Sequence, residues 1–178
     1  GDMHVYNPES GLDIYEALQG DDNIRIETVP SAASKVVRMR VDKEPWTDAR
    51  VRNALKFCQD REKLLNVAQK GLGTIGADCH VAPAMADYAP IEPRPYDPEK
   101  AKELLAEAGY PDGVDVTITV GSGWTDVVSI AETLKQDAEP AGIRININAV
   151  PNSTYWDQWT EADMGITGVN FAAVREGT

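Results

Sequence analysis

The sequence has little positive charge. Its 178 residues include 17 Lys and Arg against 29 Asp and Glu, which gives a formal net charge of -12 at pH 7. A chain this acidic repels nucleic acid and anionic membranes, so neither is expected as a partner. No stretch approaches the roughly 20 apolar residues that a membrane helix needs. No apolar segment led by Lys or Arg marks a signal peptide at the start, so we expect a mature form or a piece of a longer chain.

Side chains that bind metals or act as nucleophiles are also scarce. There are two histidines, His4 and His80, and two cysteines, Cys58 and Cys79. Cys79 and His80 make at most half of a metal site, and the motifs HExxH, GxSxG and GxxxxGK[ST] are absent. We therefore expect no metal and no catalytic residues. We interpret the cysteines as unpaired apolar side chains, with one bridge in an oxidising compartment as the alternative.

Residues 71–76 have the spacing GxGxxG, which is typical of dinucleotide sites when it follows a strand and opens a helix. Here the motif follows a predicted helix and enters a loop. We therefore predict neither a dinucleotide site nor any other cofactor.

The spacing of apolar residues predicts alternating strands and helices. The expected strands are residues 23–29, 35–41, 114–120, 143–149 and 164–169. The expected helices are a short one at 12–18, one at 51–58 capped by Thr47 or Asp48, one from Asp60 to a stop at Gly71, one from the cap Asp97 to Gly109, one at 125–139, and a short one capped by Ser153. Residues 72–96 contain four prolines and are expected to be a loop. This order predicts an α/β domain with a β-α-β unit at 114–149.

One loop is a candidate ligand site. Ser122, Gly123 and Trp124 lie between a predicted strand end and a predicted helix start. In α/β sheets, ligands bind at such positions and use the backbone N–H groups of the helix N-terminus. Plain turn packing is an equally good explanation of Trp124. Trp156 and Trp159 are three residues apart on the short helix, so we expect at least one of them to pack on the core.

Three segments resemble one family. Residues 48–55 (DARVRNAL) and 60–62 (DRE) are similar to the signature D-x-R-V-R-x-A-L…D-R-E of bacterial extracellular solute-binding proteins of the oligopeptide/dipeptide class, family 5. Residues 96–113 (YDPEKAKELLAEAGYPDG) resemble that family almost letter for letter. Residues 141–145 (AGIRI) are a third match, before the last but one predicted strand. The three matches fall in order along the chain.

The resemblance implies a mixed β-sheet flanked by helices, as one lobe of a type II periplasmic-binding-protein fold. Residues 1–178 would form a single domain, the carboxyl-terminal lobe of a larger two-lobe protein. Residues 1–22 and 170–178 would be peripheral segments near the crossings to the other lobe. The implied partners are that amino-terminal lobe, a small-molecule or peptide ligand and an ABC permease. The implied location is the periplasm, or the outer face of the cell membrane through a tether.

The resemblance also implies a non-catalytic function, the capture of a solute between two lobes for an ABC importer. A solute-sensing domain of a bacterial transcription regulator is the alternative. An enzyme would need catalytic residues from a lobe that this sequence does not contain.

Peptide-binding members of the family carry G-W-x-x-D after the last strand, where the acid pairs with the peptide amine. The matching stretch here is residues 168–172, with Val169 in place of the tryptophan and Ala172 in place of the acid. A second family aromatic aligns with Asn152. The family also carries nickel chelates, haem, oligosaccharides and opine-like compounds, so the ligand stays open. The candidate ligand-binding residues are Ser122, Gly123, Trp124, Asn152, Val169 and Asn170, with His80 as a weaker candidate.

Overall fold

The computed structural model describes residues 12–27, 33–79, 81, 83, 85 and 88–170. The chain divides into two compact units, Gly1–Pro30 and Ser31–Thr178. The described part of the first unit contains the helix α1 (Leu12–Leu18), which confirms the short helix predicted there. The strands and the other helices belong to the second unit.

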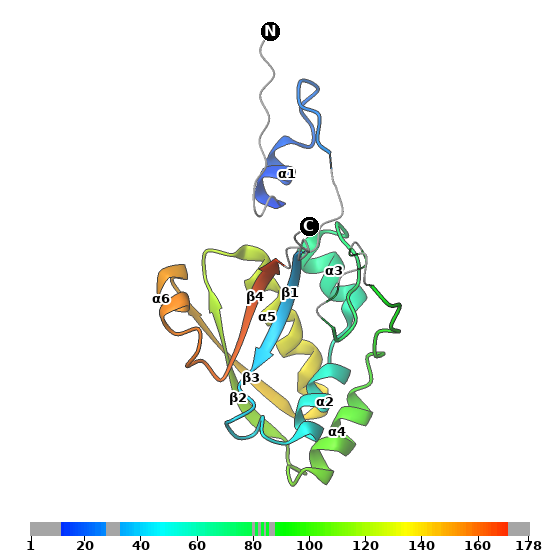
Figure 1. Cartoon of the computed structure of the whole chain (residues 1–178), viewed down its shortest axis with the longest axis vertical. Coiled ribbons are helices and arrows are strands. Elements are labelled where there is room, and N and C mark those ends of the chain that lie inside the picture. Colours follow the sequence, from blue (N-terminus) through cyan, green and yellow to red (C-terminus); the bar gives the residue numbers. More distant parts are fainter. Residues whose placement is uncertain are drawn as a thin grey trace, which may run out of the picture. The chain divides into compact units, whose positions relative to one another are not determined.

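The second unit is built on a four-stranded sheet (Figure 1). Its strands, in the order in which they lie across the sheet, are β1 (Ala33–Met39), β4 (Met164–Asn170), β2 (Val114–Gly121) and β3 (Ile143–Val150). Strand β2 is parallel to both β3 and β4, whereas β1 is antiparallel to β4. The sheet is therefore mixed, as predicted, and the β-α-β unit has the expected parallel strands.

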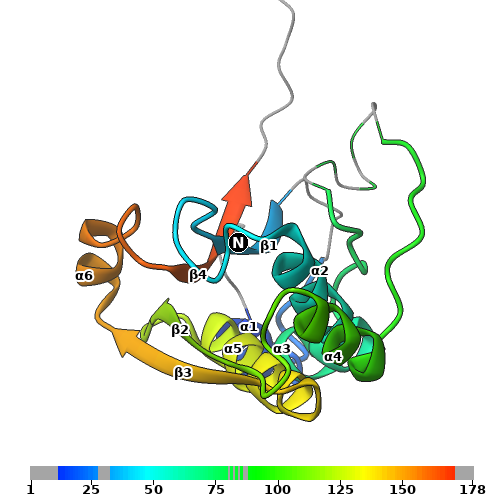
Figure 2. The same cartoon turned by 90° about the horizontal axis from the view of Figure 1, so that it is seen from below.

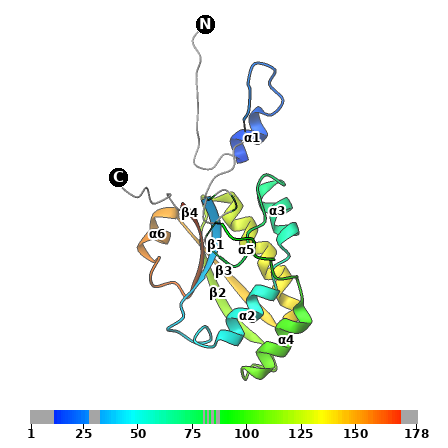
Figure 3. The same cartoon turned by 45° about the vertical axis from the view of Figure 1, so that its right-hand side comes forward.

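The helices of this unit are α2 (Ala49–Phe57), α3 (Arg61–Gln69), α4 (Pro98–Glu107), α5 (Thr125–Ala138) and α6 (Asn152–Asp157), with a 3-10 turn at Glu139–Ala141. Helices α2 to α5 lie on one side of the sheet and α6 on the other (Figure 3). The view from below also separates α6 from α2, α3 and α4 (Figure 2). Within the described residues, none of the helices combines the length and the apolar character needed to span a membrane.

Helix α5 packs against the sheet through one buried stripe. Val127, Ala131 and Leu134 are at most 1% exposed and belong to the same apolar cluster as Ile118 of β2 and Ile143 of β3. Burying one large apolar side chain stabilises a fold by about 1.5–3 kcal/mol, so this stripe holds the crossover helix onto the two strands that it connects. The cluster also includes buried side chains from around α2 and α4: Trp46, Leu55 and Leu105.

Acidic side chains cap three helices, each where the sequence predicts a helix start. Asp48 accepts a hydrogen bond from the backbone N–H of Arg50 at 2.7 Å and so begins α2. Asp60 and Asp97 begin α3 and α4 by accepting backbone N–H bonds at 3.0 and 2.8 Å. Pro98 takes the first position of α4, where its missing N–H leaves no hydrogen bond unmade.

The strand predicted at residues 23–29 is wrong over the part that the structure describes. Residues 24–27 are not in a strand, and residues 28 and 29 lie outside the described residues. Ile24 and Ile26 are 38% and 37% exposed. Alternation produces a strand only where a neighbouring strand and a buried face are available, and neither is present for these residues within the described sheet. Strand β1 begins and ends two residues earlier than predicted, because Val41 already lies in a turn and is 61% exposed.

Two predicted helix boundaries also differ. Lys70, with a left-handed φ of 54°, ends α3, and the predicted stop Gly71 follows it with a φ of 75°. Ser153 does not cap α6, because that helix begins one residue earlier, at Asn152. The cap position is Pro151, and no side chain caps the helix there. Serine is favoured at the residue before the first helical turn, but Ser153 already lies inside the helix.

The long loop predicted at residues 72–96 contains no helix or strand in its described parts. Asp78 anchors it by accepting hydrogen bonds from Arg61 of α3 at 2.5 Å and from Arg94 at 2.8 Å. Cys79 lies beside this anchor, and Cys58 is buried at the end of α2. Both are free thiols in the structure.

The turn between α4 and β2 tests how closely the backbone packs against the turn before β3. Gly113 and Gly109 both have a positive φ, of 84° and 96°. A Cβ on Gly113 would lie 2.3 Å from the carbonyl oxygen of Gly142, whereas a Cβ on Gly109 meets nothing within 4 Å. We expect Gly109→Ala to lower the free energy of unfolding by about 1 kcal/mol, from backbone strain alone. Gly113→Ala should lower it by about 3 kcal/mol or more, because backbone atoms must also move. Urea denaturation measures both, and equal losses would contradict the close approach.

Candidate ligand-binding site

The carboxyl ends of three parallel strands meet at one edge of the sheet. Gly121, the last residue of β2, pairs with Val150, the last residue of β3. Strand β4 pairs with β2 at Thr119 and Gly165, so its later residues run past the end of β2. Ligands of open α/β sheets bind in the crevice beyond these carboxyl ends. This edge, which we call the carboxyl edge, is therefore the first place to look for a site.

The loop of residues 122–124 and Asn152 come together at this edge. The N–H of Gly123 donates to Oδ1 of Asn152 at 3.0 Å, and the N–H of Ser122 donates to the carbonyl of Val150 at 2.7 Å. A Cβ on Gly123 would lie 2.9 Å from the Asn152 amide nitrogen, so a larger residue would push the two apart. The loop after β2 is thus fixed to the segment that follows β3.

The other sequence-predicted residues are placed only in part. Val169 and Asn170 lie at the end of β4, paired with Ser34 and Ala33 of β1, so their backbone belongs to the same edge. Their side chains, and His80, lie outside the described residues. Their role as ligand contacts stays a prediction.

An aromatic cluster supports the loop from the side of α6. The ring of Trp124 meets Tyr155 edge-on at 5.4 Å and Trp156 at 5.6 Å between ring centroids. Tyr155 is buried, and its hydroxyl donates to the carbonyl of Ile166 at 2.8 Å. Trp156 is 52% exposed and Trp159 is half-buried, outside the core cluster. The ring of Trp159 lies 5.8 Å from the ring of the buried Tyr155, so one of these two tryptophans packs on a buried side chain, as expected.

A charged cluster, which no sequence pattern predicts, lies at the same edge. Nζ of Lys35 lies 2.7 Å from Oδ2 of Asp126, which is 7% exposed. Gln69 donates to the same oxygen at 3.2 Å, and the N–H of Val127 donates to Oδ1 at 2.9 Å. Burial alone would raise the pKa of the Asp126 carboxyl, but these donors, Lys35 first, hold it below its usual range. Asp126 is therefore an ionised, buried partner of Lys35.

Neither residue of this pair carries a local sequence signal. Lys35 is one polar residue in an alternating strand, and Asp126 is one acid in the first turn of a helix. Only the order of the strands in the sheet brings them together.

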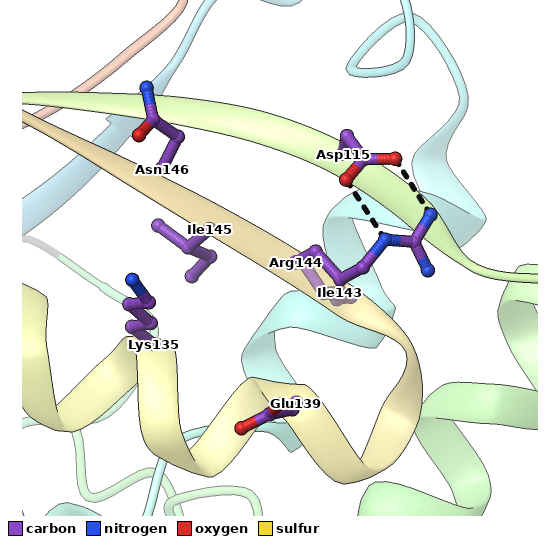
Figure 4. Close-up of a pocket in the computed structure, with 7 residues that line it drawn as sticks. All are labelled: Asp115, Lys135, Glu139, Ile143, Arg144, Ile145 and Asn146. Carbon is purple, nitrogen blue, oxygen red and sulfur yellow. Dashed lines mark hydrogen bonds and ion pairs between the residues drawn. The ribbon is translucent and has the colours of Figure 1, made fainter.

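A pocket lies far along the strands from this edge (Figure 4). It is lined by residues at the start of β3, by Lys135 of α5 and by Glu139 of the 3-10 turn. Arg144 and Asp115 form two hydrogen bonds at its rim, at 2.9 and 2.7 Å, so these two charges already satisfy each other. Among the residues that the structure describes, no group of three or more His, Cys, Asp or Glu side chains could hold a metal ion. The carboxyl edge remains the candidate site.

Comparison with known families agrees with this arrangement. Residues 1–174 match the model of the bacterial extracellular solute-binding proteins, family 5 Middle. The chain belongs to this family. The resemblance of residues 48–62 and 96–113 is thereby confirmed.

Curated proteins similar to this chain include the glutathione-binding proteins GsiB of Escherichia coli (strain K12) and of Salmonella typhimurium. Each is 32% identical to this chain over 133 residues, which cover 75% of the chain and 26% of the relative. The chain therefore spans about a quarter of the length of the curated relatives that it matches.

Solved structures share the fold. The periplasmic binding protein DppA of Helicobacter pylori, in complex with the peptide STSA, matches with a TM-score of 0.80 and 25% identity, over 90% of this chain and 31% of that one. The oligopeptide-binding protein AppA of Bacillus subtilis, in complex with a nonapeptide, matches with a TM-score of 0.77 and 22% identity, over 89% of this chain and 35% of that one. The predicted fold class, a mixed sheet flanked by helices as in periplasmic binding proteins, is confirmed.

The bond between Gly123 and Asn152 gives a test of the site's rigidity. We expect Asn152→Ala to speed hydrogen exchange at the Gly123 amide by roughly 10-fold, because the acceptor is lost. Asn152→Asp keeps an oxygen at the same place and should leave this exchange close to the wild-type rate. Amide exchange followed by NMR measures both variants. Unchanged protection of Gly123 in Asn152→Ala would show that the loop does not depend on this bond.

Proposed function

We propose that this chain is part of the substrate-binding component of an ABC importer, and that it captures a small peptide-like solute without chemistry. Family membership and the preformed loop at the carboxyl edge support the proposal. The relatives named above are binding proteins for glutathione and peptides. A short peptide with free carboxylates is therefore the ligand class that we favour.

The two-lobe mechanism follows from the family. We propose that residues 1–178 belong to the carboxyl-terminal lobe, with 1–22 and 170–178 as peripheral segments near the crossings to the amino-terminal lobe. Ligand would enter the open cleft, and closure of the lobes would present the complex to the permease. The ligand can favour closure only by the amount by which it binds the closed state more tightly than the open state. The working location would be the periplasm, or the outer face of the membrane through a tether.

The alternatives have less support. None of the relatives named above is a transcription regulator, so the solute-sensing alternative has no support from them. The named relatives are binding proteins, which favours capture over catalysis.

The proposed function is tested on the full-length protein purified from its own host. We expect native mass spectrometry to find a co-purifying solute, and calorimetry of the stripped protein to give micromolar binding of glutathione or a short peptide. The isolated chain of 178 residues should bind the same solute at least about 100-fold more weakly, because one lobe supplies only part of the contacts.

Two results would count against the proposal. A full-length protein that carries no solute and binds no member of the panel is not a solute receptor of this kind. A solute that binds the isolated chain as tightly as the full-length protein would contradict capture between two lobes.

A further inference from the structure

Helix α5 carries two ion pairs of the same kind, about three turns apart. Near its start, Asp126 pairs with Lys35 at 2.7 Å. Near its end, Asp137 pairs with Lys63 of α3 at 2.5 Å. The exposures are closely matched, with 7% and 6% for the two aspartate side chains and 33% and 39% for the two lysines. Because the pairs are so similar, the pair of Asp137 and Lys63 serves as a control: it shows how much such an ion pair contributes to stability, apart from any role of Lys35 in binding at the carboxyl edge.

The two aspartates depend on their lysines to different degrees. Asp126 lies in the first turn of α5, where the helix dipole favours an acid, and it also accepts bonds from Gln69 and from the N–H of Val127. Asp137 lies in the last turns, where the dipole disfavours an acid. Its Oδ2 has no hydrogen-bond partner among the described residues, so Lys63 is the donor that stabilises it. Asp126 would therefore keep its hydrogen bonds from Gln69 and Val127 if Lys35 shared its ammonium group with another anion.

The position of Lys35 brings that ammonium group to the carboxyl edge. Lys35 pairs with Gly168 of β4, and a Cβ on Gly168 would lie 3.6 Å from Nζ of Lys35. The register of β4 against β2, with Thr119 opposite Gly165, puts Gly168 just beyond the last residue of β2. Lys35 is thus level with the loop of residues 122–124. Its side chain is one-third exposed, so it is partly open to solvent at this edge.

Stability alone is a weak reason for such a pair. Replacing a buried ion pair with apolar side chains is often neutral or stabilising, because both charges lose their hydration. A chain with a net charge of -12 also repels anions at a distance, so binding an anionic solute requires a fixed local cation.

We infer that Lys35, held in place by Asp126, is the specificity-determining cation that binds a carboxylate of the ligand at the carboxyl edge. This inference rests on the proposed function and names the residue that would recognise the free carboxylate of its ligand. Asp126 is the positioning residue, since it fixes the lysine stem and leaves donors of the ammonium group to the ligand. The bond to the ligand is charge-assisted, and a neutral ester or amide cannot replace it.

The test uses the full-length protein, stripped of solute, and two matched variants, Lys35→Met and Lys63→Met. The probes are glutathione and its diethyl ester, and trialanine and its carboxyl-terminal amide. Calorimetry measures each affinity. We expect the wild type to prefer at least one free acid over its neutral form by 10-fold or more. Lys35→Met should weaken the binding of that acid by about 10- to 100-fold and leave the affinity for the neutral form nearly unchanged. Lys63→Met should leave the affinities for the acid and for the neutral form unchanged.

Denaturation of the same variants gives an independent readout. Lys63→Met should lower the denaturation midpoint more than Lys35→Met, because Asp137 has fewer other donors than Asp126. Lys35→Arg should recover part of the preference for the acid, since it keeps the charge. A merely structural role for Lys35 predicts the reverse, a loss of stability with an unchanged preference.

Three results would overturn the inference, and they are distinguishable from failure of the proposed function. The first is a preference for the acid that survives in Lys35→Met. The second is an equal loss of that preference in Lys63→Met. The third is a wild type that binds none of the free acids. In the third case, a solute found by native mass spectrometry would leave the proposed function standing, whereas its absence would remove both.

Discussion

The parallel pairing of β2 with β3 is the constraint on which the rest of the structure depends. The two strands pair along their whole length, from Val114 opposite Ile143 to Gly121 opposite Val150. Parallel neighbours cannot be joined by a tight turn, so the chain must cross over through a helix, and α5 is that helix. Its buried stripe of Val127, Ala131 and Leu134 closes the core against the strands that it connects. Both strands therefore end, and both following loops begin, at the same edge.

This geometry suits the recognition of a ligand. The N–H of Gly123 fixes the loop after β2 by a hydrogen bond to the Asn152 side chain, and the rings of Trp124, Tyr155 and Trp156 pack together beside it. These contacts hold the loop in place without a ligand, and a loop that is already held in place reduces the entropy that binding costs. The pair of Lys35 and Asp126 adds a fixed charge to the same edge. A second lobe that closes over it would complete the enclosure that a single sheet edge lacks.

Local signals made much of the fold predictable. The start of α4 is determined by Asp97 and Pro98, which act within one turn, and the loop of residues 122–124 follows from a clear strand beside a clear helix. The strand expected around Ile24 failed because a strand depends on a partner that alternation does not reveal. The bond from Gly123 to Asn152 spans 29 residues, and Lys35 meets Asp126 from another part of the sheet. Such pairings follow from strand order, which no single segment encodes.

We propose that solute binds at the carboxyl edge. Hydrogen–deuterium exchange of the full-length protein, compared before and after its solute is stripped, tests this most directly. We expect bound solute to slow exchange in residues 122–126 and 151–156, and to leave exchange in residues 143–146, beside the pocket of Figure 4, unchanged. Protection centred on residues 143–146, with none in residues 122–126, would contradict it.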